Sequence, residues 1–278
     1  MLPRRISRAF IAMLLLIIMF FALYPLFIMI MGSFKTASEL RSNAAGVPAA
    51  FTLENYLALL SFSGGIVVRS YLNSLFISSA HTILVIALSS MAGYAFEKYR
   101  FKGRTMIFAA LLATMMIPTE MNIPPLYIMF SKIGWLSSYQ VQILPGIANV
   151  FAMYMFRQYM KSVPDAIIEA ARLDGCGHLR TFRAIAFPIC APVTGALCII
   201  VFLGKWNDYL WPIMLVNKKE FLPIMAVLPT LNTSDNAFTI PWEIVLTGCV
   251  VVTLPLIIVF LFFQDKFMSS VAIGAVKE

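Results

Sequence analysis

Charged residues are scarce in this sequence. Asp, Glu, Lys and Arg make up 12% of its 278 residues, whereas a typical soluble domain carries about 25%. Hydrophobic residues reach 60%. These values exclude an ordinary soluble domain and indicate a chain that lies largely in a membrane. The formal net charge of +8 does not favour nucleic-acid binding, because the charges cluster between apolar runs as lipid-flanking charges do.

Residues that bind metals or act as nucleophiles are also few. The cysteines are Cys176, Cys190, Cys198 and Cys249, and the histidines are His81 and His178. No two cysteines have the close spacing of a metal site, and the two histidines are too far apart for a metal cluster. No serine or cysteine stands in a motif with a histidine. We therefore expect small buried cysteines, no metal and no enzymatic activity.

Motifs for nucleotide binding are missing. The sequence has no G-x-x-x-x-G-K-[ST] loop, so the chain does not cradle ATP phosphates in that way. Gly175 and Gly177 are not followed by the third glycine of a dinucleotide fingerprint. We expect no cofactor on this chain, and energy for any ATP-driven work must come from another chain.

Long apolar segments fill most of the sequence. A spanning helix needs ~20 mostly apolar residues. The expected spans are 9–31, 70–96, 105–130, 139–156, 189–214 and 242–263. The first could be a signal peptide, but its apolar run is too long and no small-residue cleavage site follows. Since no soluble segment is long enough to fold alone, the sequence predicts a single transmembrane domain, 1–278, of the all-α polytopic class.

The distribution of lysine and arginine predicts the orientation of these spans. With the N-terminus inside, fourteen lie on the inner side and six on the outer side. The inner ones fall in 4–8, 98–104, 157–183 and 266–277, and the outer ones in 35–69, at 132 and in 218–219. Because cytoplasmic loops carry the excess of these residues, both termini are expected in the cytoplasm.

A polar block, residues 158–188, lies between the fourth and fifth expected spans on the cytoplasmic side. Ser162 followed three residues later by Asp165, with Pro164 in the first turn, is typical of a helix N-terminus. Asp174 and Gly175 then predict a sharp turn, with Gly175 suited to positive φ. The sequence thus predicts a first short helix that ends at a glycine.

A second short helix is expected after this turn. Leu179, Phe182 and Ile185 or Ala186 recur at the spacing of one helical face, and Pro188 separates the helix from the fifth span. Neither short helix is long enough to be stable alone in water. The polar block therefore packs either on its own spans, as a plain loop, or on a cytoplasmic partner.

The polar block resembles the EAA loop of membrane subunits of ATP-binding-cassette (ABC) importers. The matching residues are Glu169, Ala170, Ala171, Asp174, Gly175, Ile185 and Pro188. Further stretches resemble the carbohydrate-import branch, similar to the smaller maltose permease subunit: Ile117-Pro118 with "IPPLY" at 123–127, "FRQY" at 156–159, "WNDYLWP" at 206–212 and "GAVK" at 274–277. The likeness extends over residues 9–278. Two residues depart from the family pattern. Phe187 stands where the family usually has Leu, and Cys176 stands where Ala is commoner; each is of the same size class as the residue it replaces.

The resemblance implies a type I ABC importer permease fold, with six transmembrane helices and a cytoplasmic coupling (EAA) helix that docks on an ATPase subunit. Glu169 would face basic groups there, and Gly175 would allow the tight turn. Two ATPase subunits would bind ATP and Mg, and a second permease subunit would complete the pathway. An extracytoplasmic solute-binding protein would deliver a sugar. The expected location is the plasma (inner) membrane, with lipid as the surroundings and no nucleic-acid partner.

The C-terminal tail, residues 264–278, has two readings. It lies just inside the membrane and is too short and polar to be a span. Gln264, Lys266 and Gly274 resemble the family's tail and would contact the ATPase subunits. The alternative is a frayed terminus.

Polar residues near the outer ends of the spans are candidates for the solute pathway. Glu120 lies in a proline-broken span, but near an outer end where a carboxylate is tolerated without a function. Lys205 and Asp208 are i, i+3 partners that can neutralise each other. The alternative is that Asp208, with Trp206 and Asn207, contacts the solute.

Two polar residues are expected at mid-depth. Asn149 can bond to a solute hydroxyl or, equally, to a neighbouring helix. His81 lies among serines, which favours hydrogen bonding between helices over a proton relay.

The favoured function is the permease subunit of an ATP-driven sugar importer. An ABC permease for another solute, such as glycerol phosphate or an amino acid, is the first alternative. An ion-coupled secondary transporter would need ionisable groups at mid-depth and an internal repeat, and the sequence has few of the former and no clear example of the latter.

Overall fold

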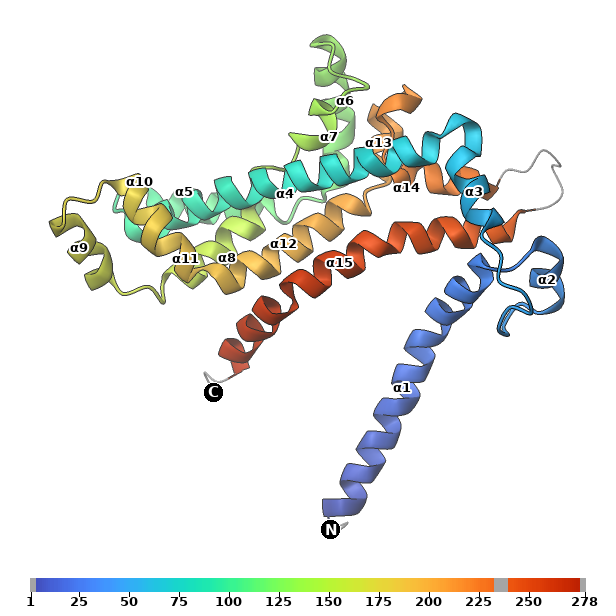
Figure 1. Ribbon diagram of the computed structural model, residues 1–278. Coiled ribbons are helices and arrows are strands. Elements are labelled where there is room, and N and C mark those ends of the chain that lie inside the picture. Colours follow the sequence, from blue (N-terminus) through green and yellow to red (C-terminus); the bar gives the residue numbers. More distant parts are fainter. Residues whose placement is uncertain (1–3, 233–239, 276–278) are drawn as a thin grey trace. The chain divides into compact units, whose positions relative to one another are not determined.

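The computed structural model describes residues 4–232 and 240–275, and the side chains of residues 10–232 and 240–264. All regular secondary structure in these residues is helical, and the described ranges contain no strand. The predicted all-α class is confirmed. Figure 1 gives the order of the main helices: α1 (Arg4–Ser33), α2 (Ala37–Ser42), α3 (Glu54–Ser61), α4 (Ile66–Lys98), α5 (Arg104–Thr114), η2 (Thr119–Asn122), α6 (Ile123–Lys132), α7 (Gln140–Ile143), α8 (Val150–Met160), α9 (Asp165–Leu173), α10 (His178–Thr181), η3 (Phe182–Ala186), α11 (Phe187–Ile189), α12 (Ala191–Trp206), α13 (Leu210–Leu215), α14 (Ile224–Val227) and α15 (Trp242–Ala275). Short turns η1 (Phe62–Gly64), η4 (Lys219–Phe221) and η5 (Leu228–Asn232) connect them.

Three helical segments are long and apolar enough to cross a membrane. They are Phe10–Ser33, Ile66–Lys98 and Trp242–Gln264, with mean hydropathies of 2.8, 1.8 and 2.9. Two further helix pairs pass the same criterion together but are bent. The angle is 93° between Arg104–Thr114 and Thr119–Lys132, and 80° between His178–Ile189 and Ala191–Trp206. The described residues therefore hold three candidate spans, or up to five if each bent pair is one span.

Three of the expected spans are not single straight helices. In the expected span 189–214, α12 ends at Trp206 and α13 begins at Leu210. The apolar segment 105–130 breaks after Thr114, and Pro118 precedes the turn that leads into α6. The expected span 139–156 is not one helix, because α7 ends at Ile143 and α8 begins only at Val150. Pro145 and Gly146 lie in the gap, and Gly146 has a φ of +83°. The apolar composition suggested continuity that these two residues interrupt.

The chain divides into two units, residues 1–69 with 227–254 and residues 70–226 with 255–278. In the first unit, α15 packs closely on α1 and on η5 at small residues. A Cβ on Gly32 would lie 2.5 Å from Leu246 Cδ1, and one on Gly248 would lie 2.5 Å from Leu231 Cδ1. Small residues let helices approach in this way in membranes.

The second unit is built around α4, α8 and α12. Val85 on α4, Phe156 on α8 and Leu197 on α12 share one buried apolar core. Gly93 on α4 is covered by α8, since a Cβ there would lie 2.7 Å from Phe156 Cβ. This unit contains the polar block and a cavity, which are the two parts of the candidate site.

Candidate functional site

The helix α9 ends in a left-handed glycine turn. Gly175 has a φ of +80°, as the sequence predicted. Its N–H donates to the carbonyl of Arg172 at 3.0 Å, and the N–H of Cys176 donates to the carbonyl of Ala171 at 2.9 Å. These two bonds form a Schellman motif, which satisfies carbonyls at the helix end and reverses the chain.

The start of α9 differs from the expectation. Ser162 does not cap the helix, because its Oγ donates to the carbonyl of Tyr159 at 2.6 Å. The helix begins at Asp165, and Pro164 occupies the N-cap position with an extended backbone, ψ 134°. Pro164 therefore lies just before the first turn and not within it. The carboxylate of Asp165 in the first turn is favourable for the helix dipole.

The second helix of the polar block is less regular than expected. It comprises α10, the π-helical turn η3 and α11. In η3 the N–H of Phe187 donates to the carbonyl of Phe182, five residues back. The predicted face is partly wrong: Phe182 and Ala186 are buried, but Leu179 is 51% exposed. A π-turn adds a residue to the helical repeat, so residues on either side of it no longer share one face.

The two faces of α9 have different surroundings. Ile168 and Ala171 are buried, whereas Glu169 and Ala170 are exposed. Leu173, at the end of the helix, is 89% exposed. Within the described residues, α9 thus offers a free face that carries a carboxylate and a large apolar side chain. Of the other residues that resemble the EAA loop, Asp174 and Pro188 are exposed and Ile185 is partly buried.

Lys98 fixes the start of the polar block to the end of α4. Its Nζ donates to the carbonyl of Val163 at 2.6 Å and to Asp165 Oδ1 at 2.7 Å. The side chain of Lys98 is 5% exposed and that of Asp165 is 78% exposed. The hydrogen bond from Lys98, with its positive charge, holds the pKa of Asp165 below its ordinary value.

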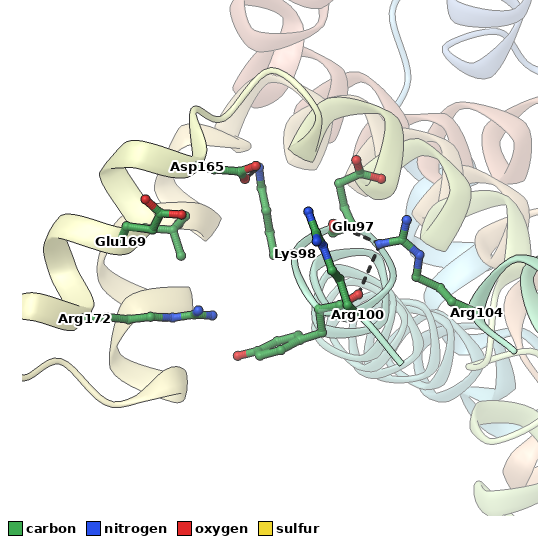
Figure 2. Close-up of a pocket in the computed structure, with 9 residues that line it drawn as sticks. Glu97, Lys98, Arg100, Arg104, Asp165, Glu169 and Arg172 are labelled. Carbon is green, nitrogen blue, oxygen red and sulfur yellow. Dashed lines mark hydrogen bonds and ion pairs between the residues drawn. The ribbon is translucent and has the colours of Figure 1, made fainter. Parts of the chain in front are cut away.

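Further charged and aromatic groups surround this contact. Tyr99 Oη and His178 Nδ1 are 2.8 Å apart, and the Arg172 guanidinium lies 5.7 Å from the Tyr99 ring centre. Figure 2 shows Asp165, Glu169 and Arg172 on α9 and Lys98 and Arg100 at the end of α4. They line a hollow of about 640 Å³. The polar block and the C-terminal end of α4 therefore meet through a network of polar contacts.

A second hollow, which we call the cavity, has a volume of about 860 Å³. Its lining combines polar and apolar side chains from α4, α6, α8, α12 and the segments between them. The lining residues are His81, Thr119, Glu120, Asn122, Pro125, Leu126, Met129, Pro145, Gly146, Asn149, Phe151, Ile200, Val201, Gly204, Lys205, Asp208 and Trp211. Its composition, mostly apolar with several polar groups, is that of a small-molecule site.

Three of the five solute-pathway candidates line this cavity: Glu120, Asn149 and Asp208. The other two, Trp206 and Asn207, are not among its lining residues. Trp206 is fully buried, with its ring stacked on Phe202 and edge-on to Tyr71. The sequence offered Trp206 as a solute contact together with Asp208, and in this structure its ring packs against other aromatic side chains.

The polar residues of the cavity also have structural partners. Lys205 Nζ lies 2.8 Å from Asp208 Oδ2, which is the predicted i, i+3 pair. Asn149 caps α8, since its Oδ1 accepts from the N–H of Ala152 at 2.8 Å. His81 Nδ1 donates to the carbonyl of Ile143 at 2.7 Å, a contact between segments as expected. Glu120 is exposed and accepts from Thr119 Oγ1 at 3.1 Å.

The tail is only partly described. The backbone of α15 is helical to Ala275, which includes Gly274. Gln264 is the last residue whose side chain is described, so the side chain of Lys266 and residues 276–278 lie outside the described residues.

Three contributors to the site were missed in the sequence. Lys98 and Tyr99 follow an apolar run, and Lys98 served there only to orient the spans. A basic residue at the C-terminal end of an expected span was the available signal, but its partner Asp165 lies 67 residues away. Leu173 has no role among the sequence-based expectations, although an apolar residue just before a glycine turn can mark a contact surface.

Comparison with known proteins identifies the family. The family described as binding-protein-dependent transport system inner membrane component matches residues 85–272. The arabinooligosaccharides transport system permease protein AraQ of Bacillus subtilis (strain 168) is 35% identical over 259 residues, covering 92% of this chain and 90% of the relative. The lactose transport system permease protein LacG of Rhizobium radiobacter is 30% identical, covering 93% and 92%.

A solved structure has the same fold. It is a bacterial ABC transporter involved in the import of the acidic polysaccharide alginate, with a TM-score of 0.85 and 22% identity, covering 95% of this chain and 97% of that chain. At this identity the likeness concerns the fold alone. The chain belongs to the binding-protein-dependent transport system inner membrane components, the permease subunits of ABC importers, and it is not an enzyme.

Proposed function

We propose that the chain translocates a sugar or related solute across the plasma (inner) membrane, powered by ATP hydrolysis on separate subunits. Two ATPase subunits would bind the ATP and Mg, and a second permease subunit would complete the pathway. An extracytoplasmic binding protein would deliver the solute. The sugar is inferred from relatives at 35% and 30% identity, which are named for arabinooligosaccharide and lactose transport.

The observation that carries the proposal is the form of α9. One face of this helix packs on the chain, and Lys98 fixes its start to α4. The opposite face, with Glu169 and Leu173, is exposed beside the left-handed turn at Gly175. An exposed apolar residue next to an acidic one suits a partner with a basic groove. We assign α9 as the coupling helix that docks on an ATPase subunit.

Within this proposal the chain crosses the membrane six times, with both termini in the cytoplasm. The spans would be α1, α4, the bent pair α5–α6, α7 with α8, α12 with α13, and α15. The three long helices and the bent pair α5–α6 support four of these, and α12 passes the same criterion only together with His178–Ile189. The remaining one rests on the apolar sequence of α8 and on the charge distribution.

Reporter fusions test this topology. Fusions after Lys102 and after Arg172 should report a cytoplasmic position, and a fusion after Lys218 should report an external one, because lysine and arginine concentrate on the cytoplasmic side. The measurement is the activity of a paired cytoplasmic and periplasmic reporter. An external position at Arg172 would contradict the coupling role of α9.

The solute pathway in this proposal includes the cavity, with Glu120, Asn149 and Asp208 in its wall. Trp206 would support the wall from behind, and Asn207 would lie beside it.

The tail from Gln264, with Lys266 and Gly274, would make a second contact with the ATPase subunits. A cysteine at Ala275 should then crosslink to an ATPase subunit in the intact complex.

Charge reversal at Glu169 tests the docking. Glu169→Lys should release the ATPase subunit from the affinity-purified membrane complex and lower uptake of arabinotriose about tenfold or more, since it places like charges in a partly desolvated contact. Glu169→Gln should have a milder effect. ATPase retention and uptake by intact cells are the two measurements.

The matched control is Glu54→Lys, because Glu54 is an exposed glutamate in α3, outside the polar block. It should retain the ATPase subunit and transport normally. Normal retention and uptake in Glu169→Lys would contradict the assignment of α9. If the unaltered chain retained no ATPase subunit at all, the importer itself would be the wrong proposal.

A further inference from the structure

The charges of the cavity are unevenly balanced. Among the described residues that line it, three are charged: Glu120, Lys205 and Asp208. Lys205 and Asp208 form an ion pair at 2.8 Å, and their side chains are 12% and 14% exposed. The pair is therefore neutral as a unit. The carboxylate of Glu120 remains, with a hydroxyl of Thr119 as its hydrogen-bond donor. The lining thus has a net negative charge and no cation without a partner.

Such a lining is unfavourable for an anion. A phosphate or carboxylate that leaves water needs guanidinium, ammonium or several backbone N–H donors in exchange. In the cavity the only ammonium among the lining residues is already occupied by Asp208. An anionic solute would also meet the carboxylate of Glu120 in surroundings of lower dielectric than water, where like charges repel more strongly.

The same lining is favourable for an uncharged polyhydroxyl compound. Glu120 and Asp208 supply acceptors, and the amides of Asn122 and Asn149 supply donors. The Asn149 oxygen is used in capping α8, which leaves its Nδ2 as the group available to a ligand. Phe151 and Trp211 add aromatic surface. Apolar walls with a few hydrogen-bonding groups match a sugar, which has both C–H faces and hydroxyls.

We propose that the cavity is a charge filter that admits uncharged saccharides and excludes anionic ones, with Glu120 as the excluding group and the Lys205–Asp208 pair masking the cation. This inference rests on the proposed function and assigns the chemical class of its solute. It separates this chain from a permease for phosphorylated or uronic-acid solutes, although the alginate importer shares its fold.

The filter can be measured without knowing the solute, by the reaction of a cavity cysteine with thiosulfonate reagents of different charge. Gly204 is a suitable position, because it lines the cavity and no atom lies within 4 Å of an added Cβ. Gly204→Cys would be made in a chain whose native cysteines are replaced. Each rate is divided by the rate with a small thiol in solution, which removes the intrinsic reactivity of the reagent.

In the complete importer, the neutral hydroxyethyl and the cationic trimethylammonium reagents should react about tenfold faster than the anionic sulfonate reagent. Glu120→Gln should bring the neutral-to-anionic ratio close to one. Asp208→Asn should favour the anionic reagent, because it leaves Lys205 without its partner. Glu54→Gln, which removes a carboxylate outside the cavity, should leave the ratio unchanged. If Gly204→Cys does not assemble, Ile200→Cys places the thiol in the same wall.

Equal rates for the neutral and anionic reagents in the unaltered cavity would overturn the filter, as would an unchanged ratio in Glu120→Gln. Uptake of arabinotriose by the same importer separates this result from the proposed function. Normal uptake of arabinotriose together with equal rates for the neutral and anionic reagents would contradict the filter but not the proposed function. Charge selectivity without ATP-dependent uptake of any neutral saccharide leaves the electrostatics in place and removes the proposed function.

Discussion

Gly175→Val is expected to reduce uptake to background and to release the ATPase subunits from the purified membrane complex. Gly175 has a φ of +80°, a conformation that a β-branched residue adopts only with strain. The cost is ~1 kcal/mol or more. No atom lies within 4 Å of an added Cβ, so within this chain the strain is in the backbone and not a steric clash. Relief of that strain would open the turn and redirect the exposed end of α9.

The neighbouring glycine provides the matched control. Gly177 has a φ of −66° and a ψ of 160°, which any residue adopts, and an added Cβ there also has no atom within 4 Å. Gly177→Val should therefore retain uptake while placing the same side chain two residues away. Gly175→Asn should be intermediate, since asparagine tolerates the left-handed region better than valine.

The measurements are arabinotriose uptake, ATPase retention, and the amount of folded chain in the membrane. The last should be unchanged in Gly175→Val, because the turn lies outside the apolar helices. Equal losses in the two valine variants would point to the bulk of the side chain. Normal uptake in Gly175→Val would show that the turn does not transmit the ATPase movement.

Lys98→Met is expected to separate ATP hydrolysis from transport. Methionine retains an unbranched apolar side chain but loses the ammonium that binds the carbonyl of Val163 and the carboxylate of Asp165. Val163 is buried, and a buried acceptor left without a donor costs about 1–3 kcal/mol. The start of α9 would then move without carrying α4 with it. We expect a lower melting temperature of the purified complex and several-fold less solute moved per ATP hydrolysed.

Lys102→Met is the control for this variant, because Lys102 is an exposed lysine of the same segment. It should hydrolyse ATP and transport as the unaltered importer does. Asp165→Asn should have a smaller effect than Lys98→Met, since Asp165 is largely exposed and its pair with Lys98 is screened by solvent. Unchanged transport per ATP in Lys98→Met would exclude Lys98 as a mechanical link.

The Lys98–Asp165 contact also has a defined pH dependence. The pKa of the Asp165 carboxyl is lowered in the fold, chiefly by the hydrogen bond from Lys98. A carboxylate of this kind contributes stability above the ordinary pKa of aspartate, and this contribution is lost as the pH falls through the lowered value. The contact is therefore complete at neutral pH and fails only in acid.

Several features of this protein follow from the sequence by itself because they depend on composition or on neighbouring residues. The low charge and long apolar runs are sufficient to indicate a membrane protein. The turn at Asp174 and Gly175 follows from the conformational freedom of one residue, and the Lys205–Asp208 pair follows from i, i+3 spacing on a helix. The turn and the ion pair each involve four residues of chain or fewer, so tertiary contacts were not needed to predict them.

Other features depend on which segments the fold brings together. Lys98 reaches Val163 and Asp165 across 65 and 67 residues, and no local pattern marks these as partners. Hydropathy could not distinguish a continuous helix over 139–156 from α7 and α8 with a break between them, since both are apolar. The π-turn η3 moved Leu179 off the buried face, and packing placed Trp206 in the interior while Asp208 lines the cavity. Periodicity in the sequence gives the faces of a regular helix, but the tertiary contacts decide where that helix is interrupted and which of its residues are covered.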